Sequence, residues 1–103
     1  MRQIRLGETD YDFKITLSSV GKFLREKGYS FGRIGEYIAA DEVMSIYSLI
    51  SLGINNADAK AGMTADKIDE IVGADFKVFG ELTERVFSYF GMEPGDPQGA
   101  AEL

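Results

Sequence analysis

Residues 45–53 read SIYSLISLG, and this stretch decides what kind of fold the chain can form. Charged side chains are absent from residue 43 to residue 57. Within this run, apolar residues recur at spacings that surround most of a 3.6-residue helix. They are Val43, Met44, Ile46, Tyr47, Leu49, Ile50 and Leu52. Such a helix must be covered on several sides, so we expect it to be the most buried helix of the domain.

The same stretch carries a serine at every third position. Ser45, Ser48 and Ser51 trace a narrow stripe of small side chains along the helix. Small side chains allow another helix to approach closely, and serine hydroxyls can hydrogen-bond back to the preceding turn. The pattern therefore favours a central helix that packs on more than one side.

Length and composition restrict the chain to simple classes. A chain of 103 residues with 45% hydrophobic residues fits one domain with a modest core. The chain has no cysteine and no histidine, which excludes disulfides and thiolate metal sites and removes the usual general base. The uncharged run is too short to span a bilayer, and residues 1–5 (MRQIR) lack the apolar stretch of a signal peptide. We therefore expect a cytoplasmic protein.

The net charge of −6 is distributed unevenly. Residues 1–35 carry seven basic and four acidic side chains, whereas the rest of the chain carries 4 basic and 13 acidic ones. The acidic balance disfavours non-specific binding to nucleic acid. Two interpretations of the basic first third stay open. It contacts an acidic partner or the acidic region of a neighbouring copy, or it is a solvated surface without a partner.

Residues 2–16 predict a β-hairpin. Ile4 and Leu6, and then Tyr11, Phe13 and Ile15, alternate with polar residues on either side of a four-residue connection at 7–10. A lone hairpin is marginally stable in water, so we expect its apolar face to pack on the helices.

The region after the hairpin predicts helices separated by glycines. The first covers residues 18–27, has an apolar side and ends at Gly28. Its apolar side holds Leu17, Val20, Phe23 and Leu24. A weaker, glycine-containing helix follows at 33–39, with Ser30 as a possible cap. Asp41 then caps the central helix, which Gly53 is expected to end.

The second half predicts a loop and two more helices. Residues 55–63 have loop composition. Thr64 caps a short helix that ends at Gly73, and Asp75 caps the last and longest helix, residues 76–90. The predicted fold is thus a mostly α (α+β) domain of four to five helices with an N-terminal β-hairpin. This domain comprises residues 1–91, and residues 92–103, which contain both prolines, are expected to form a flexible tail.

Patterns typical of catalysis or cofactor binding are missing from the sequence. Carboxylate pairs such as Asp66 and Glu70 have the spacing of ordinary helix-surface pairs. A calcium loop would need oxygen ligands where the chain has alanine at 57, 59 and 61, and a glutamate where it has Ile68. No Asp-Ser-Leu attachment site for an acyl-carrier cofactor opens a helix. We therefore expect a non-enzymatic protein without metal or cofactor that acts by binding.

The last helix carries more apolar side chains than one packing contact needs. Most of them belong to the core of so small a domain, but some are left over for a partner. They form two adjoining stripes: Phe76, Phe79, Val86, Phe87 and Phe90, and then Val78, Leu82 and Tyr89.

In the order of its elements, the chain resembles the tail assembly chaperones of long-tailed (siphovirus-type) bacteriophages and prophages. The resemblance covers residues 2–90. It begins with the hairpin IRLGETDYDFKITL, an amphipathic helix ending in FLREKGYSF, and the apolar helix VMSIYSLISLGI. In this family such an apolar helix is commonly followed by a loop and a segment of the form T-x-x-x-[IV], as MTADKI is here at residues 63–68.

This resemblance implies a non-catalytic role in virion assembly. Members of the family coat the long, helical tape measure protein and help to recruit tail tube subunits. In many members a ribosomal frameshift adds a second domain. For this chain the resemblance implies a homo-oligomer in the cytoplasm of a bacterial host that holds the tape measure protein through partly exposed apolar residues. The residues expected to bind this partner are Tyr47, Phe87, Tyr89 and Phe90.

Two other functions remain open from the sequence. The first is a small self-associating adaptor or regulatory domain, whose apolar helices would form a symmetric interface. The second is a histidine-free enzyme or cofactor carrier, which a small molecule bound in a concave polar pocket would support.

Overall fold

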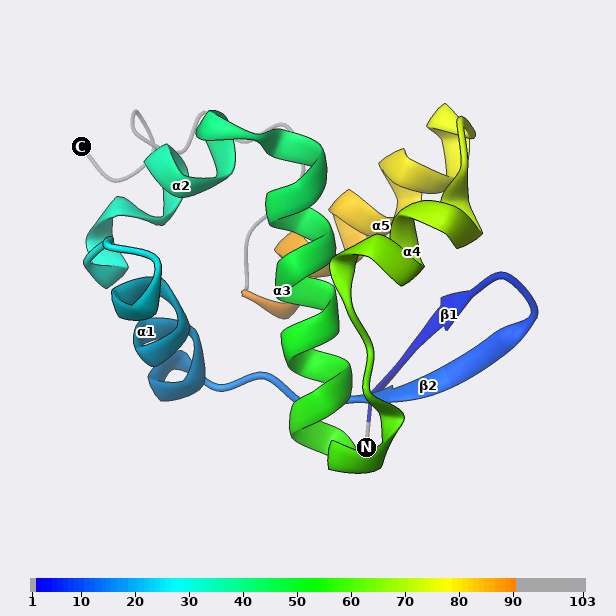
Figure 1. Ribbon diagram of the computed structural model, residues 1–103, viewed down its shortest axis with the longest axis horizontal. Helices are drawn as coiled ribbons and strands as arrows, with labels where there is room; N and C mark the ends of the chain where they lie inside the picture. Colours follow the sequence, from blue (N-terminus) through cyan, green and yellow to red (C-terminus); the bar gives the residue numbers. More distant parts are fainter. Residues whose placement is uncertain (1, 91–103) are drawn as a thin grey trace.

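The computed structural model describes residues 2–90. Its elements are β1 (Arg2–Leu6), β2 (Thr9–Phe13), α1 (Leu17–Glu26), the 3₁₀ turn η1 (Phe31–Arg33), α2 (Ile34–Ala40), α3 (Glu42–Ala57), the 3₁₀ turn η2 (Ala59–Ala61), α4 (Ala65–Val72) and α5 (Phe76–Tyr89) (Figure 1). The predicted fold class, a mostly helical domain with an N-terminal hairpin, is confirmed with five α-helices in this part of the chain. The tail predicted at 92–103 lies outside the described residues.

Helix α3 is the centre of the domain, as its sequence predicts. It runs through the middle of the structure, with α1 and α2 on one side and α4 and the hairpin on the other (Figure 1). It contacts β2, α2, η2, α4 and α5. Its buried residues are Ser45, Ile46, Tyr47, Leu49, Ile50, Gly53 and Ile54.

The serine stripe of α3 has two different roles. The Ser45 hydroxyl donates a hydrogen bond across to the backbone carbonyl of Tyr37 in α2, at 3.0 Å. The expected close approach of a second helix is therefore confirmed at Ser45. The Ser51 hydroxyl instead donates to the carbonyl of Ser48 in its own helix, at 2.9 Å.

The prediction that α3 ends at Gly53 is wrong, because α3 continues to Ala57. Gly53 is buried beneath the ring of Phe13 from the hairpin, and a Cβ atom added at Gly53 would lie 2.7 Å from Phe13 Cδ1. The backbone N–H of Lys14 also donates to the Gly53 carbonyl, at 3.0 Å. The missing side chain thus lets the hairpin approach the helix closely instead of ending the helix.

The loop expected at residues 55–63 is largely ordered secondary structure. Its first residues are the last turn of α3, and η2 follows. The Asn55 side chain fixes the rest, because its Nδ2 donates to the carbonyl of Met63 and its Oδ1 accepts from the Met63 N–H, both at 2.8 Å. An asparagine that bonds both backbone groups of one residue can hold a loop as a strand partner would. The segment is thereby held against α3, with Met63 buried.

The hairpin is tighter than predicted. Leu6 pairs directly with Thr9, so the connection is the two residues Gly7 and Glu8, and not the four residues 7–10. Gly7 has a φ of +63°, the conformation that a two-residue hairpin turn with glycine in its first position requires. Beyond the turn, Arg5 and Asp10 pair across the strands at 3.4 Å.

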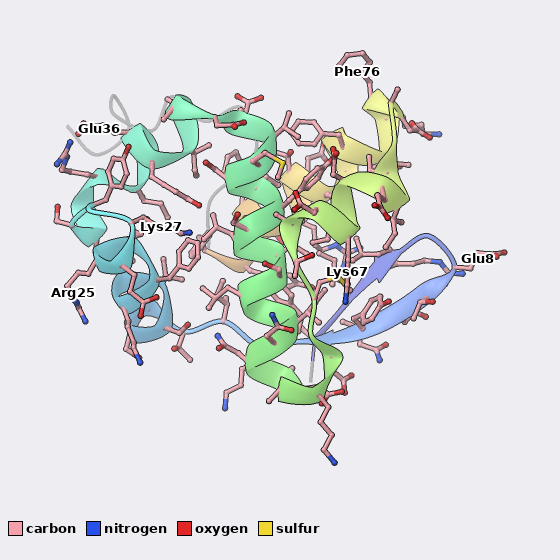
Figure 2. All side chains as sticks on the ribbon, viewed as in Figure 1. Glu8, Arg25, Lys27, Glu36, Lys67 and Phe76 are labelled. Atoms are coloured by element: carbon pink, nitrogen blue, oxygen red, sulfur yellow. The ribbon has the colours of Figure 1, made fainter. Side chains whose placement is uncertain are left out.

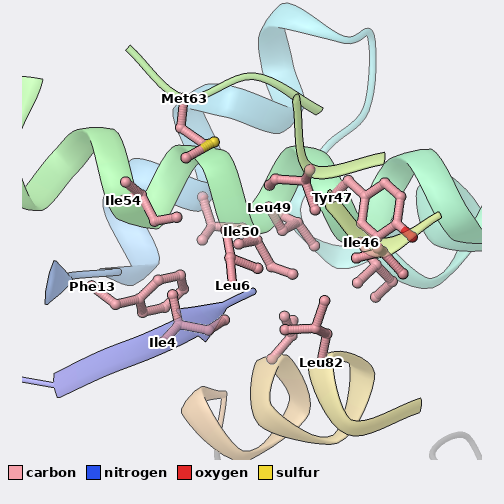
Figure 3. Packing of buried hydrophobic residues seen from close by; sticks show 14 of the residues in the cluster. Ile4, Leu6, Phe13, Ile46, Tyr47, Leu49, Ile50, Ile54, Met63 and Leu82 are labelled. Atoms are coloured by element: carbon pink, nitrogen blue, oxygen red, sulfur yellow. The ribbon is translucent and has the colours of Figure 1, made fainter. Parts of the chain in front are cut away.

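The hairpin and the helices share one hydrophobic core, and the predicted apolar face of the hairpin lies in it. Ile4, Leu6 and Phe13 point towards α3, and Leu82 of α5 closes the core from the other side (Figure 3). Ile15 lies beyond β2 and is half-buried.

Side-chain caps fix the starts of three helices. The hydroxyl of Thr64 and the carboxylates of Asp41 and Asp75 accept backbone N–H groups at the starts of α4, α3 and α5, as predicted. Ser30 precedes η1, but its side chain makes no capping hydrogen bond.

The last helix, with 14 residues, is shorter than α3, with 16, so the prediction that it is the longest is wrong. No helix among residues 2–90 is long and apolar enough to cross a membrane.

Candidate partner-binding surfaces

Tyr47 is not a partly exposed contact residue, in contrast to the expectation from the sequence. Only 2% of its surface is exposed, and its ring packs edge-on against Phe79 of α5, with 5.9 Å between the ring centres. Burial raises the pKa of the Tyr47 hydroxyl above its ordinary value, and the nearby carboxylate of Asp69 adds to the shift. A helix that is apolar on most sides gives no sequence signal of which residues face outward, and α4 and α5 cover Tyr47.

Tyr89 is half-buried and helps to hold the hairpin in place. Its hydroxyl donates a hydrogen bond to the carbonyl of Gln3, at 2.8 Å. Its ring stacks on Phe13, with 4.6 Å between the ring centres, and the guanidinium of Arg2 lies 5.0 Å above it. These contacts leave Tyr89 with a structural role.

The four predicted contact residues do not form one surface. Phe87 and Phe90 are half-buried and pack against the core. Tyr47 contacts Phe79, which precedes Tyr89 by ten residues, or about 15 Å along a helix. Tyr47 therefore lies near one end of α5, and the other three residues lie near the opposite end.

The structure shows a different apolar surface, a hollow where the first turn of α3, the end of α4 and the start of α5 meet. Carboxylates also line it, so we call it the acidic hollow. Its volume is about 390 Å³. It is lined by Glu42, Val43, Tyr47, Asp69, Val72, Gly73, Ala74, Asp75, Phe76 and Phe79.

A sharp turn between α4 and α5 builds this hollow. Gly73 ends α4 with a φ of +61°, a conformation that favours glycine. Asp75 follows, and its carboxylate accepts the N–H groups of Lys77 and Val78, both at 3.1 Å. Because the chain turns within so few residues, Phe76 at the first position of α5 stands clear of the helices and projects into solvent (Figure 2).

Phe76 is the most unusual side chain on this surface. It is 90% exposed, and Val43 of the same hollow is 40% exposed. Single exposed apolar residues are common in folded proteins. A fully exposed phenylalanine that borders an apolar hollow is different, because such patches are typical of binding sites. Phe76 and Val43 are therefore better candidates for partner contact than Tyr47.

The charged residues that line the hollow are all acidic. Glu42, Asp69 and Asp75 are among its lining residues, and within the described chain no lysine or arginine lines it. An apolar site surrounded by carboxylates favours a partner that combines apolar and cationic side chains.

A second exposed apolar surface lies on α1 and η1. We call it the α1 patch, and it is lined by Leu17, Ser18, Gly21, Arg25 and Phe31. It is an open hollow with a volume of about 390 Å³. Leu17 is 68% exposed and Phe31 is 42% exposed. The expectation that Leu17 packs inward with Val20 and Leu24 is therefore wrong. Leu17 is the first residue of α1, at the border of the buried face, and it lines the α1 patch together with the exposed Arg25.

Sequence reasoning missed both surfaces. It assigned Phe76 to a stripe with Phe79 that was expected to be mostly core. The sequence does contain one signal for the exposure of Phe76. Phe76 directly follows the capping residue Asp75, so it is the first residue of its helix. Among residues 2–90, no three acidic side chains gather in the way that metal ligands would. No family model, curated protein or solved structure matches this chain.

Proposed function

We propose that this protein is a tail assembly chaperone of a long-tailed bacteriophage or prophage. In this role it holds an apolar helical segment of the tape measure protein in the cytoplasm of the bacterial host and helps to recruit tail tube subunits. The observation that carries the proposal is the acidic hollow, where Phe76 is 90% exposed beside an apolar recess. The resemblance in the order of elements gives the client its identity.

The surface suits a helical client. A helix bound in a groove inserts side chains that are three or four residues apart. Val43 and Phe76 stand on different helices at the margin of the hollow and would contact both sides of such a helix. Glu42 and Asp69 would pair with lysine or arginine at the border of the apolar stripe of the client. The client residues therefore move from the predicted set of Tyr47, Phe87, Tyr89 and Phe90 to the neighbourhood of Phe76.

The test is co-expression with the tape measure protein of the same phage or prophage. We expect the wild-type protein to keep the tape measure protein in the soluble fraction, and Phe76→Ser to lose most of this effect. Ile71→Ser is the matched control, because Ile71 is an exposed apolar residue outside the hollow lining. An insoluble tape measure protein beside the wild-type protein would contradict the chaperone function. Equal solubilisation by Phe76→Ser would contradict the site.

A second candidate function is a self-associating adaptor. The α1 patch favours it, because this patch is also apolar but carries Arg25 where the acidic hollow carries carboxylates. Self-association combined with failure to solubilise the tape measure protein would support the adaptor over the chaperone.

A further inference from the structure

We propose that a second hollow, at the base of the hairpin, binds an acidic, proline-containing peptide, and that its occupant is the C-terminal segment 91–103 of the same chain. We call it the basic hollow. Its volume is about 560 Å³, and it is lined by Arg2, Phe13, Lys14, Ile15 and Tyr89. It lies at the opposite end of α5 from the acidic hollow and shares no lining residue with it.

The floor of the basic hollow is fixed by contacts within the domain. The Tyr89 ring stacks on the buried ring of Phe13, with 4.6 Å between the ring centres. The backbone N–H of Lys14 donates to the carbonyl of Gly53 at 3.0 Å, and the Lys14 carbonyl accepts from Nδ2 of Asn56 at 3.2 Å. The aromatic floor and the backbone that carries Lys14 are therefore preformed, so a ligand does not have to order them.

The charged residues that line the basic hollow are both cationic. The side chains of Arg2 and Lys14 are exposed, and neither forms an ion pair with another residue in the range 2–90. The guanidinium of Arg2 lies 5.0 Å above the ring of Tyr89. Two cations beside an aromatic floor favour a ligand that combines carboxylates with apolar groups.

The C-terminal segment has the matching charge and starts at the hollow. Residues 91–103 read GMEPGDPQGAAEL, with three acidic side chains and no lysine or arginine. Tyr89, which lines the hollow, directly precedes Phe90, the last residue before this segment. Glu93 and Asp96 are three and six residues beyond Phe90, and an extended chain spans about 10 and 20 Å over these distances. Both carboxylates can therefore reach the basic hollow.

The prolines give the segment a suitable shape. Pro94 and Pro97 form a P-x-x-P pattern, and each of them directly follows an acidic residue, Glu93 or Asp96. A residue before proline favours an extended or polyproline II backbone, which has three residues per turn. The two prolines therefore share one side of the segment, and the two carboxylates share another. Segments of this kind dock on aromatic-lined grooves at low entropic cost, with the prolines on the aromatic rings.

Attachment to the same chain makes even a weak contact sufficient. A short flexible linker holds its ligand at an effective concentration in the millimolar range. An acidic segment of another protein has to displace this tethered ligand before it can bind. The C-terminal segment thus restricts the basic hollow to acidic partners that bind more tightly than itself.

The first experiment measures the backbone order of the full chain by NMR relaxation at two salt concentrations. We expect order parameters above about 0.6 for Glu93 and Asp96 at about 0.02 M salt. They should fall below this value at about 0.5 M salt, where the screening length shortens to about 4 Å. Order parameters below about 0.6 at both salt concentrations would overturn the proposal, because the segment would then be undocked throughout.

A spin label shows where the segment docks. Because the chain has no cysteine, Gln98→Cys provides a single attachment site for a nitroxide. At low salt we expect the label to broaden the amide signals of Arg2, Lys14 and Ile15 more than those of any other residue before α5, and to lose most of this effect at about 0.5 M salt. Stronger broadening on α1, which also carries exposed cations, would overturn the location.

Two charge reversals separate a specific contact from an effect of net charge. Lys14→Glu removes one cation from the basic hollow, and Lys77→Glu makes the same change at the opposite end of α5. Both side chains are exposed, so both variants should keep the wild-type circular dichroism. We expect Lys14→Glu to remove roughly half or more of the broadening and Lys77→Glu to leave it unchanged. Equal effects of the two variants would contradict a contact at the basic hollow.

The ligand side is tested by the double variant Glu93→Gln and Asp96→Asn, which keeps both prolines. It should lose the broadening as Lys14→Glu does, and undiminished broadening would contradict the role of the carboxylates. None of these measurements involves the tape measure protein, so this inference and the proposed function fail separately.

Discussion

The replacement Gly53→Ala tests how the hairpin is seated on the central helix. In an ordinary helix interior, alanine stabilises relative to glycine by up to about 1 kcal/mol. At position 53 the added methyl group would lie 2.7 Å from Phe13 Cδ1 and closer still to Cε1 and Cζ of the same ring, whereas ordinary contacts begin at 3.4 Å. The Phe13 ring, buried and stacked on Tyr89, would have to retreat by roughly 1 Å.

The expected result is net destabilisation. Overpacking of a tight core costs about 1–3 kcal/mol, and this contact lies at the upper end because a rigid ring has to move. After subtraction of the gain in helix propensity, we expect a loss of about 2 kcal/mol in the free energy of unfolding. For a domain of this size the melting temperature should fall by roughly 8–16 °C. Urea titration and thermal melting, both followed by circular dichroism, measure the two quantities.

Gly80→Ala is the matched control. Gly80 lies inside α5, and a Cβ atom there would meet nothing within 4 Å. This variant should gain about 0.5–1 kcal/mol. Phe13→Leu combined with Gly53→Ala should cost less than the sum of the two single changes, because the smaller side chain leaves room for the methyl group. If Gly53→Ala stabilised the protein as Gly80→Ala does, the close packing of Phe13 on α3 would be refuted.

Three further predictions concern α3 and its neighbours. Leu49→Ala should lower the free energy of unfolding by about 2–5 kcal/mol in urea titration, because Leu49 is fully buried, and a cost near zero would mean that α3 faces outward. Because burial raises the pKa of Tyr47 in the folded state, the unfolded state loses its proton first, and stability is lost as the pH rises above about 10. The free energy of unfolding of Tyr47→Phe should therefore fall less steeply than that of the wild-type protein between about pH 9.5 and 11, and parallel curves would count against the shift. Asn55→Ala removes both hydrogen bonds to Met63 and should cost about 1–3 kcal/mol, with faster protease cleavage at 58–63; unchanged cleavage would show that the Asn55 bonds do not hold this segment.

The parts of the fold that depend on neighbouring residues could be predicted from the sequence. Asp41, Thr64 and Asp75 cap their helices through bonds to residues two or three positions away, so the pattern is local. The inward face of the hairpin follows from alternation, and the central place of α3 follows from its lack of a charged face.

The role of Gly53 depends on contacts far along the sequence. A glycine after an apolar helix is typical of a helix end and also of a close packing contact. Only Phe13, 40 residues earlier, decides between the two, and no local pattern contains it.

The candidate surfaces escaped sequence reasoning for a similar reason. Phe76 and Phe79 are three residues apart and belong to one apolar stripe, yet Phe79 packs on Tyr47 and Phe76 is exposed. Periodicity gives the direction of a side chain but not whether a neighbouring helix reaches it. Leu17 and Val20 are likewise three residues apart, yet Leu17 is exposed and Val20 is buried.

The bond between Tyr89 and Gln3, which joins residues 86 positions apart, bears on the order of folding. During synthesis the hairpin leaves the ribosome first, but α3 and the end of α5 follow only later. Contacts so distant in sequence form slowly, because a long loop must close before they contribute. The hairpin should therefore dock last, and a nascent chain that lacks α5 should expose the apolar face of Ile4, Leu6 and Phe13. A ribosome that pauses before α5 would hold the chain in the state most prone to aggregation.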